Sequence, residues 1–317
     1  MGARQKKLIL SLNQKLKSFS VLSHMNMYAK FKDCLFGLNN GARLLFLYLV
    51  FVNSFVAQAQ YESNAHIGEF GIQSGVAHYF GDLNTRTGFK RPHPAIGVFY
   101  RKQINNYSAL RGAVYFTQLS YSDKLQDGNE FQRRRNLDFK SSIWEFSLMG
   151  DFNFFRFNPE SPNERFTPFL TFGLGLFHCN PFTYYEGEKY FLRALGTEGQ
   201  NSAQFPDRKE YGTIGLCIPI GFGFKWAMNK KVNLHFELTH RFTNTDFIDD
   251  VSGNYAGVGA FQPGSVAAVL QDRSIETGPA IGTEGNQRGF NANKDQFIIA
   301  NFGITLNFSS YRCPGSN

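Results

Sequence analysis

The stretch "YGTIGLCIPIGFGFKW" (211–226) alternates between large apolar residues and small or polar ones. Every second position from Ile214 to Trp226 is apolar, and the positions between them carry Gly, Cys, Pro or Lys. Successive side chains of a β-strand point to opposite faces of the sheet. The period of two therefore predicts a strand with one apolar face and one small or polar face.

The same alternation recurs along the chain and predicts eight strands. They span 66–80, 95–103, 108–121, 143–155, 169–178, 211–226, 232–242 and 297–308. A tilted membrane strand needs about 9–11 residues, and single-chain bacterial barrels have an even number of strands. The predicted fold class is all-β, an eight-stranded antiparallel transmembrane barrel of the outer membrane.

The connections between these strands alternate in length. Residues 104–107, 158–168 and 227–231 form the short set, and the longest connection precedes the last strand. Short turns on one side and long loops on the other are typical of outer-membrane barrels, in which the short turns are periplasmic and the long loops extracellular.

The non-apolar face carries both signs of charge in equal number. Its charged members are Glu69, Arg101, Arg111, Glu145, Asp151, Lys225, Glu237 and Arg241. A narrow eight-stranded barrel fills its interior with side chains, so this balance favours an internal network of ion pairs. The alternative is a soluble barrel of lipocalin type, or a sandwich, with the apolar face inward; a solvated outer face normally carries more Lys and Glu and fewer Gly.

Three further residues bear on the barrel. Trp144 and Trp226 are expected in the two aromatic belts at the membrane interfaces. Pro219 lies inside a predicted strand, and a closed barrel has no edge strand to hold it, so we expect a β-bulge there.

Positive charge is concentrated near the N-terminus. The chain has a formal net charge of +8, but residues 1–59 contain eight Lys or Arg and one acid, Asp33. The remainder is therefore close to neutral and lacks the basic surface that a nucleic-acid partner requires.

The N-terminal region resembles an export signal. Arg43 precedes an apolar run at 44–56, and Ala57 and Ala59 follow in an A-x-A arrangement. The run is shorter than the ~20 residues of a spanning helix, which favours a signal peptide cleaved after Ala59 over a transmembrane anchor. The predicted organisation is an N-terminal extension with signal peptide at 1–59, the barrel at 60–308 and a periplasmic tail at 309–317.

No pattern of catalytic, cofactor-binding or metal-binding residues emerges from the sequence. A barrel enzyme acting on lipid would need a catalytic constellation near the outer rim, where His178 and His240 are the only candidates. Neither has a Ser in a recognisable frame. We therefore expect a protein that is not an enzyme and has no cofactor.

Three cysteines follow the predicted cleavage site, Cys179, Cys217 and Cys313. An odd number in an oxidising compartment leaves one thiol without an intramolecular partner. The alternation of side chains along the strands places Cys179 and Cys217 on the face that points into the barrel. Inert thiols are one interpretation, and the other is a disulfide between Cys313, in the periplasmic tail, and a partner protein.

Two polar stretches lie in predicted external loops. "RRR" at 133–135 is interpreted as a solvated segment near lipopolysaccharide phosphates. "TDFIDDVSGNY" (245–255) places Asp246, Asp249 and Asp250 close together, and with Asn254 they could offer oxygen ligands to calcium. The usual D-x-D-x-D-G order is absent, so this stretch is interpreted mainly as the transition from strand to loop.

Several phrases resemble one known group of barrels. They are "GVAHYFGDLN" (75–84), "YRKQINNYSALRGAVYFTQLSYSD" (100–123), "PFLTFGLGLFHCNP" (168–181), "IPIGFGFKW" (218–226), "TDFIDDVSGNY" (245–255) and the ending "YRCP". Together they resemble the PorG-like outer-membrane barrels of Bacteroidetes. That resemblance implies a structural component of the type IX secretion system, which serves protein export and, in gliding species, gliding motility. It further implies contact with outer-membrane lipid and with periplasmic ring subunits and a lipoprotein.

The sequence therefore predicts a structural anchor in the cell outer membrane. Partner contact is expected at the periplasmic turns 104–107, 158–168 and 227–231 and at the tail. The alternative is a small barrel of adhesin or ligand-binding type that acts through its long extracellular loops.

Overall fold

The computed structural model describes residues 66–85, 88–126, 128–200, 202–290 and 292–309. The predicted leader at 1–59, most of the tail and Cys313 lie outside the described residues.

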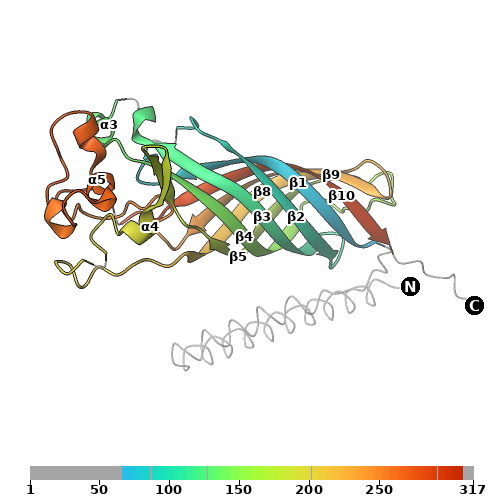
Figure 1. Cartoon of the computed structure of the whole chain (residues 1–317). Helices are drawn as coiled ribbons and strands as arrows, with labels where there is room; N and C mark the ends of the chain where they lie inside the picture. The colour runs from blue at the N-terminus through green and yellow to red at the C-terminus, as the bar shows by residue number, and fades with distance from the viewer. Residues whose placement is uncertain (1–65, 86–87, 127, 201, 291, 310–317) are drawn as a thin grey trace, which may run out of the picture. The chain divides into compact units, whose positions relative to one another are not determined.

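Eight long strands pair edge to edge and close into an antiparallel barrel (Figure 1). Their bounds are β1 His66–Phe80, β2 His93–Gln103, β3 Ser108–Ser122, β4 Asp138–Asn153, β5 Phe166–His178, β8 Ile214–Ala227, β9 Val232–Thr243 and β10 Gln296–Ser309. Each strand pairs with its neighbour in the chain, and β10 pairs with β1 to complete the circle. The predicted fold and all eight predicted strands are confirmed; β4 begins earlier than expected and β8 begins three residues later.

The predicted bulge at Pro219 is wrong. Pro219 stays in register opposite Arg241 on β9. On its other side, pairing with β5 stops after Ile220 opposite Phe172 and resumes, without a shift, at Cys217 opposite Gly175. Proline has no N–H to donate, so the ladder loses bonds locally, but no extra residue is needed.

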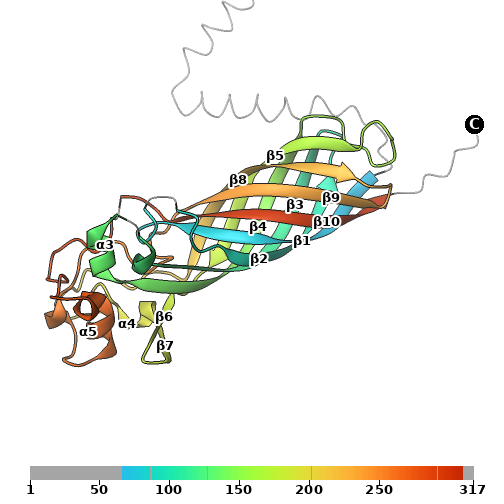
Figure 2. The same ribbon diagram turned by 90° about the horizontal axis from the view of Figure 1, so that it is seen from above.

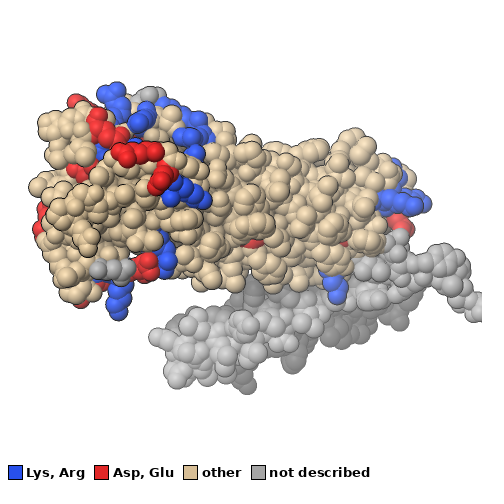
Figure 3. Space-filling view, viewed as in Figure 1, with Lys and Arg blue, Asp and Glu red and all other residues tan. Residues whose placement is uncertain are grey.

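The outer surface of the barrel is a continuous apolar belt. On the face shown in Figure 3, charged residues lie towards the two ends and leave a broad band between them largely free of charge. The exposed members of the belt include Phe70, Ile72, Val76, Ile96, Val98, Leu110, Phe146, Leu148, Leu170, Phe172, Leu174, Leu176, Ile214, Leu216, Ile218, Ile220, Phe222, Phe224, Phe302, Ile304 and Leu306. Removing one such side chain from water is worth about 1.5–3 kcal/mol, so the belt is the surface of a transmembrane barrel.

The two tryptophans mark the ends of this belt. Trp144 lies opposite His178, the last residue of β5, and Trp226 lies opposite Phe166, the first. Both indole side chains are more than half exposed, at 56% and 54%. This placement agrees with the two predicted aromatic belts.

The barrel interior is filled and charged. All eight charged residues predicted to face inward are buried, and they pair across the lumen. Asp151 lies 2.5 Å from Arg101 and 3.4 Å from both Arg111 and Lys225. Arg101 also binds Glu69 at 2.6 Å, and Arg111 binds Glu237. Arg241 pairs separately with Glu145 at 3.0 Å.

Interior glycines leave the room that these side chains occupy. A Cβ at Gly215 would collide with the ring of Phe177, and one at Gly303 would collide with the imidazole of His235. The guanidinium of Arg101 packs over the ring of Phe99, 4.7 Å from its centroid. The lumen is therefore a packed core and not an open channel.

The long loops at one end carry secondary structure that the sequence analysis did not predict (Figure 2). The additional elements are η1 Asp123–Leu125, α3 Glu130–Arg135, β6 Phe182–Tyr185, β7 Glu188–Phe191, α4 Leu192–Leu195, η2 Val258–Ala260, α5 Val266–Gln271 and η3 Arg273–Glu276. Each helix is only one or two turns long, too short to show an apolar periodicity in the sequence. No helix in the described part of the chain is long and apolar enough to cross a membrane.

We predict that Asp151→Asn destabilises the barrel by about 3–5 kcal/mol, because it leaves three buried cations with too few carboxylates. Denaturant unfolding in detergent micelles, followed by the fluorescence of Trp144 and Trp226, measures the change. Glu160→Gln, on an exposed turn, is the matched control and should unfold as the wild type does. Equal unfolding midpoints for Asp151→Asn and the wild type would contradict a cooperative network.

Candidate functional site

The four long loops gather into one folded unit, here called the cap. Its described residues are 81–85, 88–92, 123–126, 128–137, 179–200, 202–213, 244–290 and 292–295. The cap has its own buried apolar residues, among them Leu83, Leu192, Ile248 and Leu270, which are continuous with the core at the mouth of the barrel.

The arginine run 133–135 is not the solvated segment that the sequence suggested. Arg135 is buried and binds both carboxylate oxygens of Asp123 at 2.7 Å. It also donates to the backbone carbonyls of Asp82 and Arg288, which belong to two other loops. In this run Arg133 is exposed and Arg134 is half-buried. Helix α3 turns Arg135 inward, so this residue joins loops and does not face the solvent.

The acidic stretch 245–255 is also buried. Asp246 accepts a hydrogen bond from Ser252, Asp249 accepts one from Tyr79, and Asp250 accepts bonds from Thr197 and Tyr211. The three carboxylates therefore bind different partners and do not converge as calcium ligands. No group of three or more His, Cys, Asp or Glu among the described residues is arranged to hold a metal ion.

Tyr79 links the barrel mouth to the longest loop. Its hydroxyl lies 2.5 Å from Oδ2 of Asp249 and 2.9 Å from Oδ1 of Asp295, and all three residues are buried. A phenol has one proton and can donate to one carboxylate only. The Tyr79 hydroxyl can therefore donate to only one of Asp249 and Asp295. Its contact with the other aspartate is a hydrogen bond when that carboxyl group is protonated and donates to the phenol oxygen. The geometry therefore favours a shared proton at this site.

The electrostatic surroundings agree with this geometry. Burial, and then the charge of Asp295, raises the pKa of Asp249 well above its ordinary value. Burial, and then the charge of Asp246, raises the pKa of Asp295 in the same way. Burial raises the pKa of Asp246 to about 7. Asp82 faces the same cluster from the loop between β1 and β2 and adds negative charge.

A second buried cluster joins the two longest loops. Arg288 binds Glu198 at 3.1 Å and donates to the carbonyl of Asp250. Glu198 in turn accepts the backbone N–H groups of Ser252 and Gly253 at 2.9 and 3.1 Å. Asp250 has a positive φ of 67°, a conformation that Asp tolerates better than most residues. This cluster holds the loop between β5 and β8 against the loop between β9 and β10.

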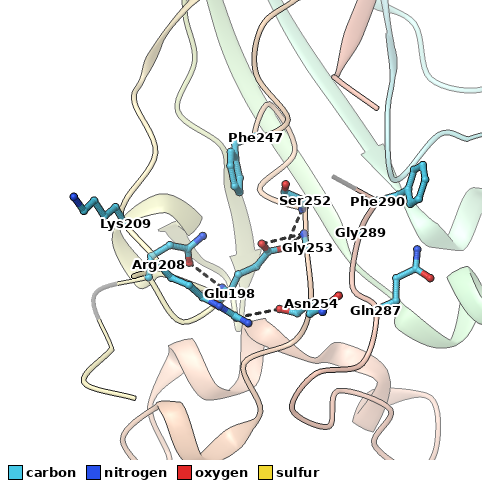
Figure 4. Close-up of a pocket in the computed structure, with 11 residues that line it drawn as sticks. Glu198, Arg208, Lys209, Phe247, Ser252, Gly253, Asn254, Gln287, Gly289 and Phe290 are labelled. Atoms are coloured by element: carbon cyan, nitrogen blue, oxygen red, sulfur yellow. Dashed lines mark hydrogen bonds between the residues drawn. The ribbon is translucent and has the colours of Figure 1, made fainter. Parts of the chain in front are cut away.

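A pocket of about 580 Å³ opens along this seam (Figure 4). It is lined by Glu198, Gln200, Arg208, Lys209, Phe247, Ser252, Gly253, Asn254, Gln287, Gly289 and Phe290. Its size is within the range of about 300–1,000 Å³ that small-ligand sites occupy. The sequence analysis identified none of these residues as a site except Asn254, because the two halves of the pocket are far apart in the chain.

The remaining candidate residues lie elsewhere. His178 is exposed on the outer face, and His240 packs between Phe80 and Phe242 with its Nε2 2.7 Å from Gln296 Oε1. Cys179 and Cys217 are buried and free. Cys217 lies inside β8 on the inward face that its position in the strand predicted, whereas Cys179 is the first residue beyond β5 and belongs to the cap.

The predicted short turns lie at the end of the barrel opposite the cap (Figure 1). They are tight: Asn105 accepts two backbone N–H groups in one, and Asn229 accepts two in another. Ile104 and Met228 are exposed at their tips, and Phe155 is exposed at the end of β4.

Comparison with known proteins places the chain in a family. The family described as "Domain of unknown function (DUF6089)" matches residues 43–278. No curated protein is significantly similar to the chain.

Three solved barrels illustrate the structural similarity. The N-terminal β-barrel domain of Pseudomonas aeruginosa OprF is 11% identical, with 77% of this chain and 99% of that chain covered and a TM-score of 0.32. Ail of Yersinia pestis is 10% identical, with 76% and 99% covered and a TM-score of 0.36. Neisserial surface protein A is 11% identical, with 76% and 97% covered and a TM-score of 0.36. Similarity at this level carries no argument about binding or activity.

We predict that the cap loosens as pH rises. A carboxyl group whose pKa is raised in the folded state stabilises that state most when protonated, below the unfolded pKa of about 3.9, and the stabilisation is lost as pH rises through the folded pKa. Hydrogen exchange of the Ile248 and Val251 amides, corrected for intrinsic rates, should therefore show at least about tenfold less protection at pH 8 than at pH 5, the effect of one pKa unit.

Asp249→Asn mimics the protonated acid and should reduce this pH dependence. Asp207→Asn, in an exposed part of the cap, is the control and should keep it. If Asp249→Asn and the wild type respond to pH identically, Asp249 does not share the proton.

Proposed function

We propose that this chain, which belongs to the DUF6089 family, is a non-conducting outer-membrane barrel that acts as a structural anchor. The observation that carries the proposal is the packed lumen, in which Asp151 and its three cationic neighbours are buried in the interior. Wide aqueous channels need about 16–18 strands, and this barrel has eight. Both observations support a function other than transport through the lumen.

The outer belt supports insertion into the membrane. Its apolar side chains face outward on every strand, and its two ends are marked by Trp144 and Trp226. A barrel with this surface is stable in a bilayer and not in water. The export signal predicted at 1–59 and the barrel fold together favour the outer membrane, with the cap extracellular and the short turns periplasmic.

The specific role that we propose is to anchor a periplasmic ring complex of the type IX protein secretion system, with its ring subunits and lipoprotein as partners. This part of the proposal rests on the resemblance to PorG-like barrels. Two of the short turns support such a contact. Their backbone N–H groups donate to the side-chain oxygens of Asn105 and Asn229, and they expose the apolar side chains of Ile104 and Met228. A fixed surface loses little conformational entropy when a partner binds.

Affinity purification from membranes tests the anchor. We expect periplasmic subunits to be recovered with the wild-type barrel, and the paired change Ile104→Ser and Met228→Ser to reduce their recovery severalfold. Val258→Ser, at an exposed position of the cap, is the control and should leave recovery unchanged. Recovery of no periplasmic partner with the wild type would overturn the anchor function, and steady conductance in planar bilayers would overturn the non-conducting barrel.

The Cys313 hypothesis remains a prediction, since this residue lies outside the described part of the chain. A disulfide to a partner should appear as a higher-mass band on non-reducing gels of membranes. That band should disappear in Cys313→Ser and persist in Cys179→Ser, whose thiol is buried. Absence of any such band would contradict a disulfide between Cys313 and a partner protein.

A second candidate function is ligand binding through the cap. The observation that favours it is the pocket at the seam between the two longest loops, whose lining residue Glu198 is paired with Arg288. This function is compatible with the anchor, because the two use opposite ends of the barrel.

A further inference from the structure

We propose that the cap pocket binds an acidic saccharide. This proposal rests on the second candidate function, binding through the cap, and is independent of the anchor. The chemistry recognised is a sugar ring that bears a carboxylate or phosphate. Such a group can come from lipopolysaccharide in the same membrane or from a free polysaccharide.

The frame of the pocket is held rigidly before any ligand arrives. Glu198 fixes the backbone of Ser252 and Gly253 from one loop to the other. Arg208 donates to the carbonyl of Glu198 and, at 3.2 Å, to the carbonyl of Asn254. Because these contacts already join the two sides, binding of a ligand costs little additional conformational entropy.

Two aromatic rings form the walls. Phe247 is stacked on Tyr211 with centroids 4.4 Å apart and planes within 7°, so its position is fixed. Phe290 is 51% exposed, and Figure 4 shows it across the opening from Phe247. A sugar ring has apolar C–H faces that pack against such rings, and a site of this kind combines aromatic walls with a few polar groups.

Two exposed carboxamides lie on the rim between these walls. Asn254 and Gln287 lie on two segments of the loop between β9 and β10 that pair there through an isolated antiparallel β-bridge. Each carboxamide offers both a donor and an acceptor, and a sugar hydroxyl needs both. A purely anionic or purely apolar ligand would leave one of these capacities unused.

The charge balance favours an acidic sugar over a neutral one. Three of the residues that line the pocket are charged: Glu198, whose carboxylate is paired with Arg288, and the two cations at the edge, Arg208 and Lys209. The carboxylate of Asp82 lies behind this lining, where it accepts the N–H of Phe290. Lys209 is exposed, and Arg208 packs over Phe205 at 4.1 Å. A positive edge raises the local concentration and affinity of an anionic ligand.

Fluorescence anisotropy with the purified full-length protein in detergent micelles tests the proposal. The probes are labelled oligogalacturonate, malto-oligosaccharide of the same length, and oligoglutamate. We expect oligogalacturonate to bind at least about tenfold more tightly than the other two, a difference of about 1.4 kcal/mol. Lys209→Gln and Phe290→Ser should each weaken its binding severalfold. Lys230→Gln, on a turn at the opposite end, is the matched control and should bind as the wild type does.

The other possible binding results also test the proposal. Equal binding of the neutral oligosaccharide would overturn the acidic specificity, and tighter binding of oligoglutamate would show a peptide site instead. Unchanged affinity in both pocket variants, with their folding confirmed by wild-type unfolding midpoints, would place any binding elsewhere. Competition by lipopolysaccharide vesicles would identify the membrane as the source, and competition by free polysaccharide alone would identify a soluble one. None of these results bears on the recovery of periplasmic partners, so the proposed anchor function is tested independently.

Discussion

The structure depends on one constraint: charges enclosed in a narrow barrel must neutralise each other. The lumen of an eight-stranded barrel is filled by side chains, so a carboxylate there loses its hydration and recovers the energy only from close cations. Asp151 is central because Arg101, Arg111 and Lys225 all reach it from other strands. The network ties β2, β3, β4 and β8 together across the lumen, adds β1 and β9 through Glu69 and Glu237, and closes the path that water or ions would take.

The cap follows a different electrostatic rule. In the barrel the buried charges are balanced, whereas in the cap Asp249 and Asp295 meet at one tyrosine hydroxyl with Asp82 and Asp246 nearby. Such a cluster is stable when protons replace the missing cations. We therefore expect the cap to respond to changes of pH. A single chain combines a rigid membrane segment with an outer unit whose stability is adjustable.

The two ends of the barrel are built for different tasks. The short turns are small and fixed, and they present a few apolar side chains. The cap is a folded unit with its own core, in which Arg135 binds backbone carbonyls of two neighbouring loops and Arg288 binds the carboxylate of Glu198 from a third. A sealed barrel separates these ends physically, so a contact on one side need not disturb the other.

The sequence by itself determined the strands and the direction of their side chains, because a period of two is a local property that each segment shows alone. It therefore predicted the outer belt and the eight buried charges. It could not determine which charges pair, since Arg111 and Glu237 are 126 positions apart and meet only when the sheet closes. For the same reason it misinterpreted Arg135 as part of a solvated segment and did not predict the burial of Asp250. Their burial was decided by the tertiary structure, in which four long loops pack together and exclude water from polar groups that the sequence shows only as polar.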